Sequence, residues 1–449
     1  MTCEPRSKKR FLFSFRKFPI PLKIMPLHIL NKCSTFFKKE VIPTAKDSMS
    51  IFTQLSEVPT DAIFGLNAAF VADKRIGKVN LGIGIYQNEE GQIPILQAVK
   101  EVESLLVKNE KSKTYLPIAG DENYLHHVGI LTFGNAFWEK HSSKTAAMQS
   151  IGGTGALRIG GELLHKSGIK KIWIPDLSWL NHKEVFLSCK LEVETYPYYD
   201  KKHHKVAFEE FCGFLEALPS RSVILLHAIC HNPTGADFTS EQWKILLDIF
   251  TSKNHIPFFD SAYQGFGVGV EEDAFAIRLF AQKGIEIVVA CSYSKNFGLY
   301  AERIGALFIT TGSEQIKDTV MSVLRKKIRQ SYSNPPSHGM SIVLEILRQP
   351  ILKDLWEKEI MQMRKRIFIL RDKFLVALSE KSQLDFTFLK DRRGMFCYTE
   401  LSKKQVDRLI EKHGIYMTND GRINLTGFNQ NNFEKVVALL AKEIKDAQS

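Results

Sequence analysis

Between Lys170 and Thr310, short apolar runs alternate with segments that have helical spacing of apolar and polar residues. This alternation is typical of a parallel sheet covered by helices, so we predict an α/β core. The predicted strands are Lys171 to Ile174, Leu191 to Tyr196, Val223 to His227, Ile256 to Phe259, Ile285 to Ala290 and Gly305 to Ile309.

Three further segments have a helical pattern. Thr239-Ser-Glu-Gln242 precedes apolar residues at helical spacing, which predicts a capping box at the start of a helix. A long helical pattern runs from about Glu357 to Glu380, and another runs from Asn432 to Ile444. These two predict a second, smaller α/β unit near the C-terminus.

The composition is that of a globular enzyme-sized protein. The chain has 449 residues, of which 44% are hydrophobic and 24% charged, and this excludes disordered, collagen-like and coiled-coil classes. The length allows two or three domains. No run of eighteen apolar residues occurs, so we predict no membrane span and no membrane partner.

Most of the formal charge of +12 lies in the first 48 residues, which hold eleven Lys or Arg and three Asp or Glu. The other 401 residues carry only +4, so a nucleic-acid partner is not expected. The basic leader, residues 1–48, has three interpretations: an organelle transit peptide, a basic tail, or codons before the true start at Met49. We expect it to contribute nothing to the functional site.

The seven cysteines are scattered, odd in number and without a CxxC pair, at positions 3, 33, 189, 212, 230, 291 and 397. This pattern favours free thiols in a reducing compartment, and we expect a cytoplasmic protein unless the leader is a genuine transit peptide. It indicates no metal site.

Polar residues that follow the predicted strands are the candidates for chemistry, because ligands of α/β sheets bind at the carboxyl ends of strands. Lys295 follows one strand, within Ser292-Tyr-Ser-Lys-Asn-Phe-Gly. A lone lysine is usually a solvated charge, but a partly desolvated amine also forms Schiff bases. Asp260 ends a buried strand and needs a partner, either a helix N-terminus or a protonated pyridine nitrogen.

Two other segments offer hydrogen-bond donors. His231-Asn232-Pro-Thr-Gly235 supplies amides in a turn, and Gly152-Gly153-Thr154-Gly155 places glycines where a helix begins. Exposed backbone amides at a helix start bind anions, although glycine before a helix is more often only a turn.

Taken in order, these motifs resemble the aspartate aminotransferase family of fold-type I pyridoxal-phosphate enzymes. The resemblance runs from about Met49 to the C-terminus and rests on nine segments. They are Asn80 to Tyr86, Ile151 to Arg158, Ser178 to His182, Asn232 to Gly235, Asp260 to Tyr263, Ser292 to Gly298, Arg303 to Gly305, Ser331 to Pro336 and Gly421 to Asn424. It implies a large domain with a mostly parallel sheet, a smaller α/β domain, and pyridoxal 5'-phosphate as cofactor.

The resemblance also implies roles around the cofactor ring. Lys295 holds the cofactor and moves a proton at the substrate α-carbon, while Asp260 pairs with the ring nitrogen and is oriented by His182. Tyr263 and Asn232 bond the ring oxygen. The stacking ring on the cofactor face is Trp179, which also borders the substrate.

At the phosphate, the resemblance implies a cup made of Gly153, Thr154, Ser292 and Arg303. Tyr115 would reach this phosphate from a neighbouring subunit. The implied assembly is therefore a homodimer with shared active sites.

For the substrates, which would be an amino acid and a 2-oxo acid, the resemblance assigns two arginines. Arg422, with Gly84 and Asn232 beside it, would bind the α-carboxylate. Arg329 of the partner chain would bind the distal carboxylate of aspartate or glutamate.

The expected function is transfer of the amino group between L-aspartate and 2-oxoglutarate by a ping-pong mechanism. Departures from the family pattern are Ala301 in place of asparagine, a changed Pro117 to Gly120 turn, and Ile85, Gln87 and Ile93 near the entrance. The last three make the entrance more apolar, so an aromatic or broad-specificity aminotransferase is the alternative. A third interpretation is a binding protein on a retired enzyme body.

The expected domain division places an arm and the first part of the small domain in residues 49–93. The large cofactor domain spans 94–361, and the rest of the small domain spans 362–449.

Overall fold

The computed structural model describes residues 50–58 and 62–446. The chain divides into two units, one ending at Pro59 and the other beginning at Thr60. In the first unit, residues 51–54 form a turn, and the Leu55 N–H donates to the Phe52 carbonyl at 3.0 Å. The predicted basic leader, residues 1–48, lies outside the described residues.

The second unit contains a seven-stranded sheet in the order β2-β10-β9-β8-β7-β3-β4. Strands β9, β8, β7, β3 and β4 are parallel neighbours, whereas β10 runs antiparallel to both β9 and β2. The strands are β2 (Thr145–Ile151), β3 (Lys171–Pro175), β4 (Glu192–Tyr196), β7 (Val223–His227), β8 (Ile256–Ser261), β9 (Val288–Ser292) and β10 (Ile304–Thr310). The mostly parallel α/β sheet predicted from the sequence is confirmed.

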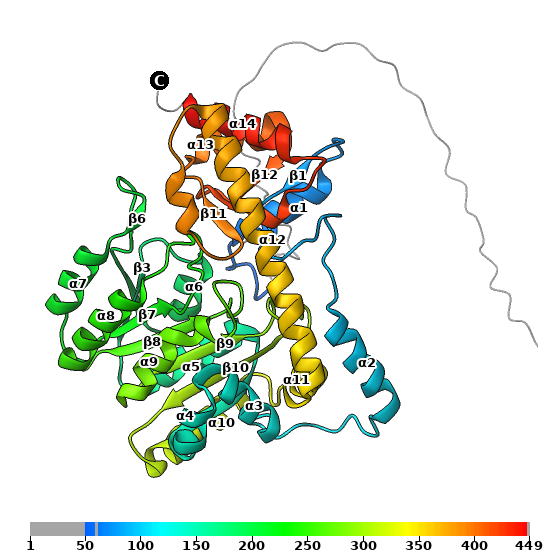
Figure 1. Cartoon of the computed structure of the whole chain (residues 1–449). Helices are drawn as coiled ribbons and strands as arrows, with labels where there is room; N and C mark the ends of the chain where they lie inside the picture. Colours follow the sequence, from blue (N-terminus) through cyan, green and yellow to red (C-terminus); the bar gives the residue numbers. More distant parts are fainter. Residues whose placement is uncertain (1–49, 59–61, 447–449) are drawn as a thin grey trace, which may run out of the picture. The chain divides into compact units, whose positions relative to one another are not determined.

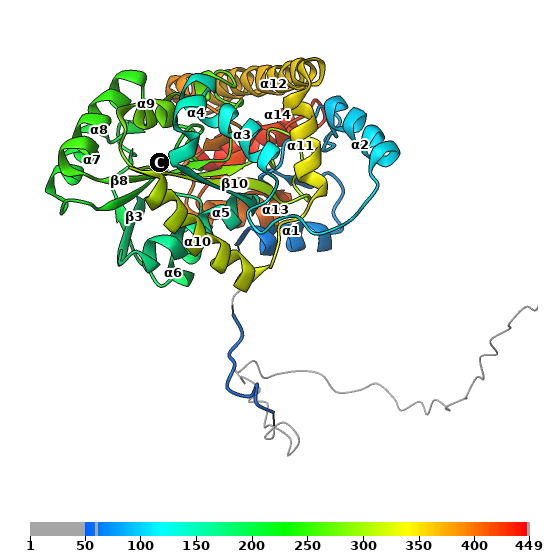
Figure 2. The same cartoon turned by 90° about the horizontal axis from the view of Figure 1, so that it is seen from below.

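Helices cover both faces of this sheet, as Figure 2 shows. On one face lie α3 (Glu122–Phe133), α4 (Asn135–His141), α7 (Phe208–Ala217), α8 (Ser240–Lys253), α9 (Phe275–Lys283) and α11 (His338–Arg348). On the other lie α5 (Gly152–Lys166), α6 (Asn181–Ser188) and α10 (Glu314–Ser331). The predicted capping box is present at α8, where the Thr239 and Gln242 side chains bond each other's backbone N–H.

The central strand β8 shows why the sheet is stable. Phe258 and Phe259 are both fully buried, but they belong to the cores on opposite faces, because successive strand residues alternate in direction. Each buried phenylalanine contributes about 1.5–3 kcal/mol. The carboxyl end of this strand is therefore held rigidly from both sides.

A third, smaller core lies towards the C-terminus and includes Val79 and Leu81 from the early part of the chain. Around it are β1 (Val79–Asn80), parallel to β12 (Ile415–Tyr416), and β11 (Phe396–Tyr398), antiparallel to β13 (Arg422–Asn424). The helices here are α13 (Lys403–His413) and α14 (Phe433–Lys445), the second at the position predicted from Asn432 to Ile444. The remaining early helices are α1 (Ala62–Ala72) and α2 (Gln97–Asn109), and β5 (Tyr199–Asp200) pairs with β6 (Lys205–Val206).

The helix α12 (Pro350–Ser382) has 33 residues and runs past both parts, as Figure 1 shows in yellow and orange. Its residues up to Ile367 join the core of the large sheet, and those from Leu370 join the smaller core. The expected domain boundaries at 93/94 and 361/362 stay a prediction. Within residues 50–58 and 62–446, no helix combines the length and apolarity that crossing a membrane requires.

The sheet differs from the predicted strands mainly in two places. β9 begins at Val288 instead of Ile285. Before this strand, the Thr310 hydroxyl accepts from the Ile287 N–H and donates to the Ile285 carbonyl, so a side chain bonds backbone groups that a longer strand would pair. Strand β2 has no counterpart among the predicted strands.

Candidate active site

Polar residues meet where the parallel strands end. His227, the last residue of β7, lies opposite Asp260 near the end of β8, and Ser261 lies opposite Cys291 of β9. Ser292 closes β9. This arrangement follows from the parallel register, which brings the carboxyl ends of neighbouring strands to one edge of the sheet.

A cavity of about 440 Å³ opens at this edge. Most of the site residues predicted from the sequence line it: Gly84, Gly153, Thr154, Trp179, Asn232, Asp260, Tyr263, Ser292, Lys295, Arg303 and Arg422. They come from segments more than three hundred residues apart along the chain, so the fold brings them together. Tyr115 and Arg329 are not among the lining residues.

Asp260 is held at the floor of the cavity by a buried histidine. His182 Nε2 is 2.9 Å from Asp260 Oδ2, and His182 Nδ1 is 2.8 Å from the Ser178 hydroxyl. Burial favours the protonated carboxyl, but the His182 hydrogen bond, helped by the charge of Lys295, lowers the pKa of Asp260. The result is a carboxylate fixed at the end of a strand.

His227 stays neutral beside this pair. Burial, reinforced by the charge of His182, lowers its pKa to about 3. Its Nε2 is 3.4 Å from the same Ser178 hydroxyl, and its ring meets that of His182 edge-on.

Lys295 lies in the turn after β9, and its Nζ is 5.0 Å from the centre of the Tyr263 ring. Burial lowers the pKa of its amine, Asp260 opposes this shift, and the cations Arg303 and Arg422 add to it. A lysine with a lowered pKa is a better nucleophile at neutral pH. Burial raises the pKa of the Tyr263 phenol, so this hydroxyl stays protonated and can donate a hydrogen bond.

The other end of the cavity is built for an anion. Helix α5 begins at Gly152 with no side-chain cap, so its first amides are open to a ligand, and Gly153 and Thr154 line the cavity there. The Arg303 guanidinium donates to the Ser294 hydroxyl at 3.3 Å and the Tyr300 carbonyl at 3.1 Å.

Glycines are required at this end for a steric reason. Gly152 has φ +73°, and a Cβ there would lie 2.5 Å from Arg303 Nη2. A Cβ on Gly153 would lie 2.9 Å from the Ser292 Cβ. Any residue other than glycine at positions 152 and 153 would therefore push Arg303 and Ser292 away from the helix start.

Arg422 is the fourth charged residue of the cavity, after Asp260, Lys295 and Arg303, and is 4% exposed. It donates to Asn232 Oδ1 at 3.0 Å and to the Gly82 carbonyl at 2.8 Å, and its guanidinium lies 4.2 Å from the centre of the Phe396 ring. Its Nε is buried without a partner, and no described carboxylate forms an ion pair with it. Burial lowers its pKa, and an anionic ligand would supply the missing charge.

Tyr115 and Arg329 lie on the surface instead. Tyr115 is 87% exposed, and Arg329 is exposed at the end of α10, where it bonds the Ser333 hydroxyl. The two segments are neighbours, because the Ser333 hydroxyl bonds Asn334, whose side chain donates to the Leu116 carbonyl at 2.7 Å.

The lining residues that the sequence prediction missed include Phe396, Tyr300 and Ser294. Phe396 contacts Arg422 and also meets the Tyr263 ring edge-on. The signal for Ser294 is local, since it lies within the lysine motif. Nothing near Phe396 in the sequence indicates its place, which depends on the pairing of β11 with β13.

The donor set fits pyridoxal phosphate, the cofactor that the resemblance implies. The open amides of α5 with Ser292 and Arg303 suit a phosphate dianion, and the glycines leave the room that any side chain would fill. The carboxylate of Asp260 suits a protonated ring nitrogen, and the Lys295 amine suits an aldehyde.

Comparison with known proteins places the chain in a family. Residues 76–440 match the family described as aminotransferase class I and II. The chain is 43% identical to an aspartate aminotransferase of Pseudomonas aeruginosa over 88% of its length and all of that protein. It is 40% identical to an aromatic-amino-acid aminotransferase of Escherichia coli, over 87% of the chain and 99% of that protein.

Among solved structures, a similar one is an aromatic-amino-acid aminotransferase of Burkholderia pseudomallei covalently bound to pyridoxal phosphate. It has 41% identity and a TM-score of 0.84, and the match covers 88% of this chain and all of that one. Sequence and structure thus agree with the chemistry of the cavity: the chain belongs to the aminotransferase class I and II family and is an aminotransferase.

Proposed function

We propose that the protein transfers the amino group between L-aspartate and 2-oxoglutarate, giving oxaloacetate and L-glutamate, with pyridoxal 5'-phosphate as cofactor. The observation that carries this proposal is the buried Arg422, a cation without a described carboxylate partner, in the same cavity as Lys295 and Asp260. An amino acid substrate would place its α-carboxylate at Arg422 and its amino group near Lys295.

Pyridoxal phosphate, when bound, supplies an aldehyde for the amino group and a ring that draws the electron pair from the substrate α-carbon. Lys295 Nζ holds the cofactor, and its lowered pKa keeps part of the amine neutral, so that it moves the proton at the α-carbon. The Asp260 carboxylate, fixed by its bond to His182, would pair with the ring nitrogen and keep that nitrogen protonated.

The remaining residues bind and orient the cofactor. Arg303, Ser292, Gly153 and Thr154 hold the phosphate at the start of α5, and Asn232 and Tyr263 bond the ring oxygen. Trp179 stacks on the ring. Its own ring meets that of His182 edge-on at 5.2 Å, which limits its rotation.

Arg422 binds the α-carboxylate beside Gly84. The guanidinium has more N–H donors than its contacts with Asn232 and Gly82 use, so a two-pronged bond to a carboxylate remains available. Burial of the arginine strengthens that bond, because water competes little for either partner.

We also propose a homodimer with shared active sites, in which Arg329 of one copy binds the distal carboxylate in the cavity of the other and Tyr115 reaches its phosphate. In support, both residues are exposed, both lie outside the cavity of their own chain, and their segments are bonded together through Asn334. Cytoplasmic localisation is proposed on the free thiols of the five described cysteines, 189, 212, 230, 291 and 397.

A broad or aromatic specificity is the second candidate, because the cavity has an apolar side. Ile83, Ile85 and Leu180 line it, and Phe396 covers Arg422. Of the three substitutions at the entrance, only Ile85 lines the cavity. Gln87 and Ile93 do not.

The test is a panel of amino donors on the purified protein with pyridoxal phosphate and 2-oxoglutarate. We expect the highest kcat/KM with aspartate. A higher value with phenylalanine or tyrosine would favour the aromatic alternative, and no turnover with any donor would favour the binding-protein interpretation.

A further inference from the structure

One wall of the cavity has no secondary structure. Residues 82–87, which include the lining residues Ile83, Gly84 and Ile85, form neither helix nor strand. A buried backbone needs hydrogen-bond partners, and here side chains replace a strand ladder. Asn424 donates to the carbonyls of Ile83 and Ile85, each at 2.8 Å, and Arg422 donates to the carbonyl of Gly82.

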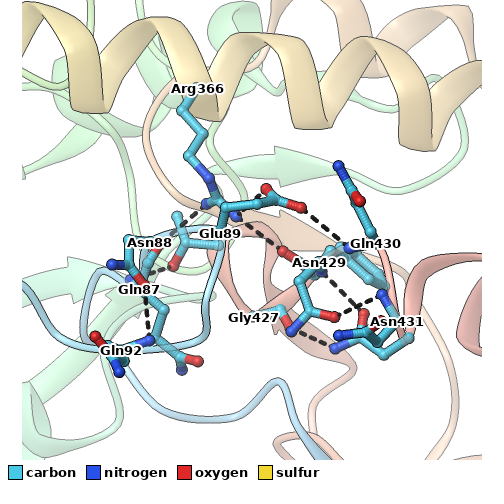
Figure 3. A network of polar contacts seen from close by, with 12 residues as sticks. Gln87, Asn88, Glu89, Gln92, Arg366, Gly427, Asn429, Gln430 and Asn431 are labelled. Atoms are coloured by element: carbon cyan, nitrogen blue, oxygen red, sulfur yellow. Dashed lines mark hydrogen bonds and ion pairs between the residues drawn. The ribbon is translucent and has the colours of Figure 1, made fainter.

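The far end of this wall is held by Arg366 of α12. As Figure 3 shows, its side chain points from the helix to the loop that contains Gln87 and Glu89. Nη1 donates to the Gln87 carbonyl at 2.9 Å, while Nη2 donates to the Phe428 carbonyl at 3.0 Å and to Glu89 Oε2 at 3.1 Å.

We call the contacts of Arg366 with Gln87, Glu89 and Phe428 the clasp. Further hydrogen bonds connect the clasp to the turn before α14. Glu89 Oε1 accepts from the Gln430 N–H at 3.0 Å, and the Gln87 N–H donates to the Thr426 hydroxyl at 3.1 Å. Thr426 in turn bonds Asn424, the residue that holds the middle of the wall. Arg366 therefore fixes the wall and its support to the same helix.

The same helix also fixes the chain downstream of the wall. Glu359, seven residues before Arg366, accepts from the first amides of α2, Gln97 at 2.6 Å and Ala98 at 3.0 Å. A carboxylate at a helix start is a strong anchor. The segment between Gln87 and Gln97 is thus tied to α12 at both ends.

We propose that Arg366 is a positioning residue for substrate binding: it sets the wall of residues 82–87 against Arg422 without lining the cavity. Loss of the clasp frees the Gln87 end of the wall, and the Gly82 carbonyl then no longer orients Arg422. This inference rests on the proposed role of Arg422 as the α-carboxylate site. The inference does not depend on the proposed roles of Lys295, Asp260 or the residues that hold the phosphate.

The test compares Arg366→Gln with wild type as holoenzymes with aspartate and 2-oxoglutarate. We expect KM for both substrates to rise about tenfold, with kcat changed less than about threefold, because binding is weakened and the reacting groups stay in place. The visible absorption band of the cofactor and its pH dependence should not change.

Arg408→Gln is the matched control. Arg408 of α13 donates from Nε at 3.0 Å and from Nη2 at 2.6 Å to Glu443 Oε2 of α14, and neither residue lines the cavity. The Arg408→Gln variant should have a lower melting temperature than wild type and unchanged KM values for both substrates. Arg366→Lys should restore part of the wild-type KM, and Glu89→Gln, which keeps both carbonyl contacts of Arg366, should raise KM less than Arg366→Gln.

If Arg366→Gln does not fold, Thr426→Val removes the hydroxyl bonded to the Gln87 N–H with little change of shape and serves for the same measurement. Unchanged KM values in a folded variant would overturn the proposal, and so would a shift of the cofactor band, since Arg366 would then act on the cofactor site. Failure of the wild-type enzyme to use any amino acid would contradict the proposed function instead.

Discussion

The two groups of charged residues assigned to the site differ in how they are built. Lys295, Asp260 and Arg422 lie in one cavity, each with burial or a hydrogen bond that shifts its pKa. Tyr115 and Arg329 lie in the open and outside that cavity. The difference teaches that one chain brings the three buried groups together by itself, whereas Arg329, if it binds the distal carboxylate as proposed, would have to act in the cavity of another copy.

The largest expected effect is the loss of turnover when a residue of the buried group, Lys295, is replaced. Lys295→Ala should lower turnover by several orders of magnitude, because no other lysine lines the cavity to move the proton. Steady-state rates with aspartate measure this, and cofactor binding through Asp260 and Arg303 should persist. Wild-type activity in this variant would end the proposed mechanism.

On the exposed side, Arg329→Ala should lower kcat/KM for aspartate by about two to three orders of magnitude, since the distal carboxylate loses its partner in a desolvated site. Phenylalanine has no distal charge, so its kcat/KM should fall much less. Arg325→Ala, an exposed arginine one turn earlier on α10, is the control and should change neither. Equal losses for both substrates would mean that Arg329 acts on folding or assembly.

A smaller effect is expected at the helix start. Gly152→Ala should weaken pyridoxal phosphate binding by about one to two orders of magnitude, because the new Cβ displaces Arg303. Gly168→Ala is a matched control: its φ is +90° and nothing lies within 4 Å, so it has the backbone strain without the clash. Equal cofactor affinity in the two variants, measured by fluorescence titration, would show that the clash is not what matters.

The smallest expected effect is on the pH dependence of stability. The folded-state pKa of His227 is about 3, below the ordinary value of 6.5, so only the unfolded chain takes up a proton between these values. Stability should be full above about pH 6.5 and decline as the pH falls towards 3. In His227→Gln the melting temperature should fall less steeply over this range, and an identical slope would exclude burial of a neutral His227.

Much of the fold was accessible from the sequence because the central strands of its sheet are apolar on both faces. Phe258 and Phe259 illustrate this, since a run buried on two sides is apolar at every position. Strand β2 escaped prediction because Gln149 and Ser150 are buried polar residues in an alanine-rich run, and only its pairing with β10 makes it a strand. The full length of α12 was missed at its start, where Pro350 occupies the first turn.

For the site, the motifs located most of the polar residues that line the cavity, because each motif has an unusual local composition. The supporting residues have no such signal. Phe396 reaches Arg422 through pairing of distant strands, and Arg366 holds Gln87 across 279 positions of sequence. Contacts of this kind depend on the tertiary structure and leave no periodicity or spacing to read.

The most direct test of the division between the two groups is complementation between inactive variants. Lys295→Ala and Arg329→Ala chains, unfolded together and refolded as a mixture, should form hybrid dimers. Each hybrid has one cavity with an intact Lys295 and an intact Arg329 from the partner copy. Random pairing predicts recovery of about one quarter of wild-type activity on aspartate. Activity no higher than that of the two variants refolded separately would contradict the account, because both residues would then serve the same chain.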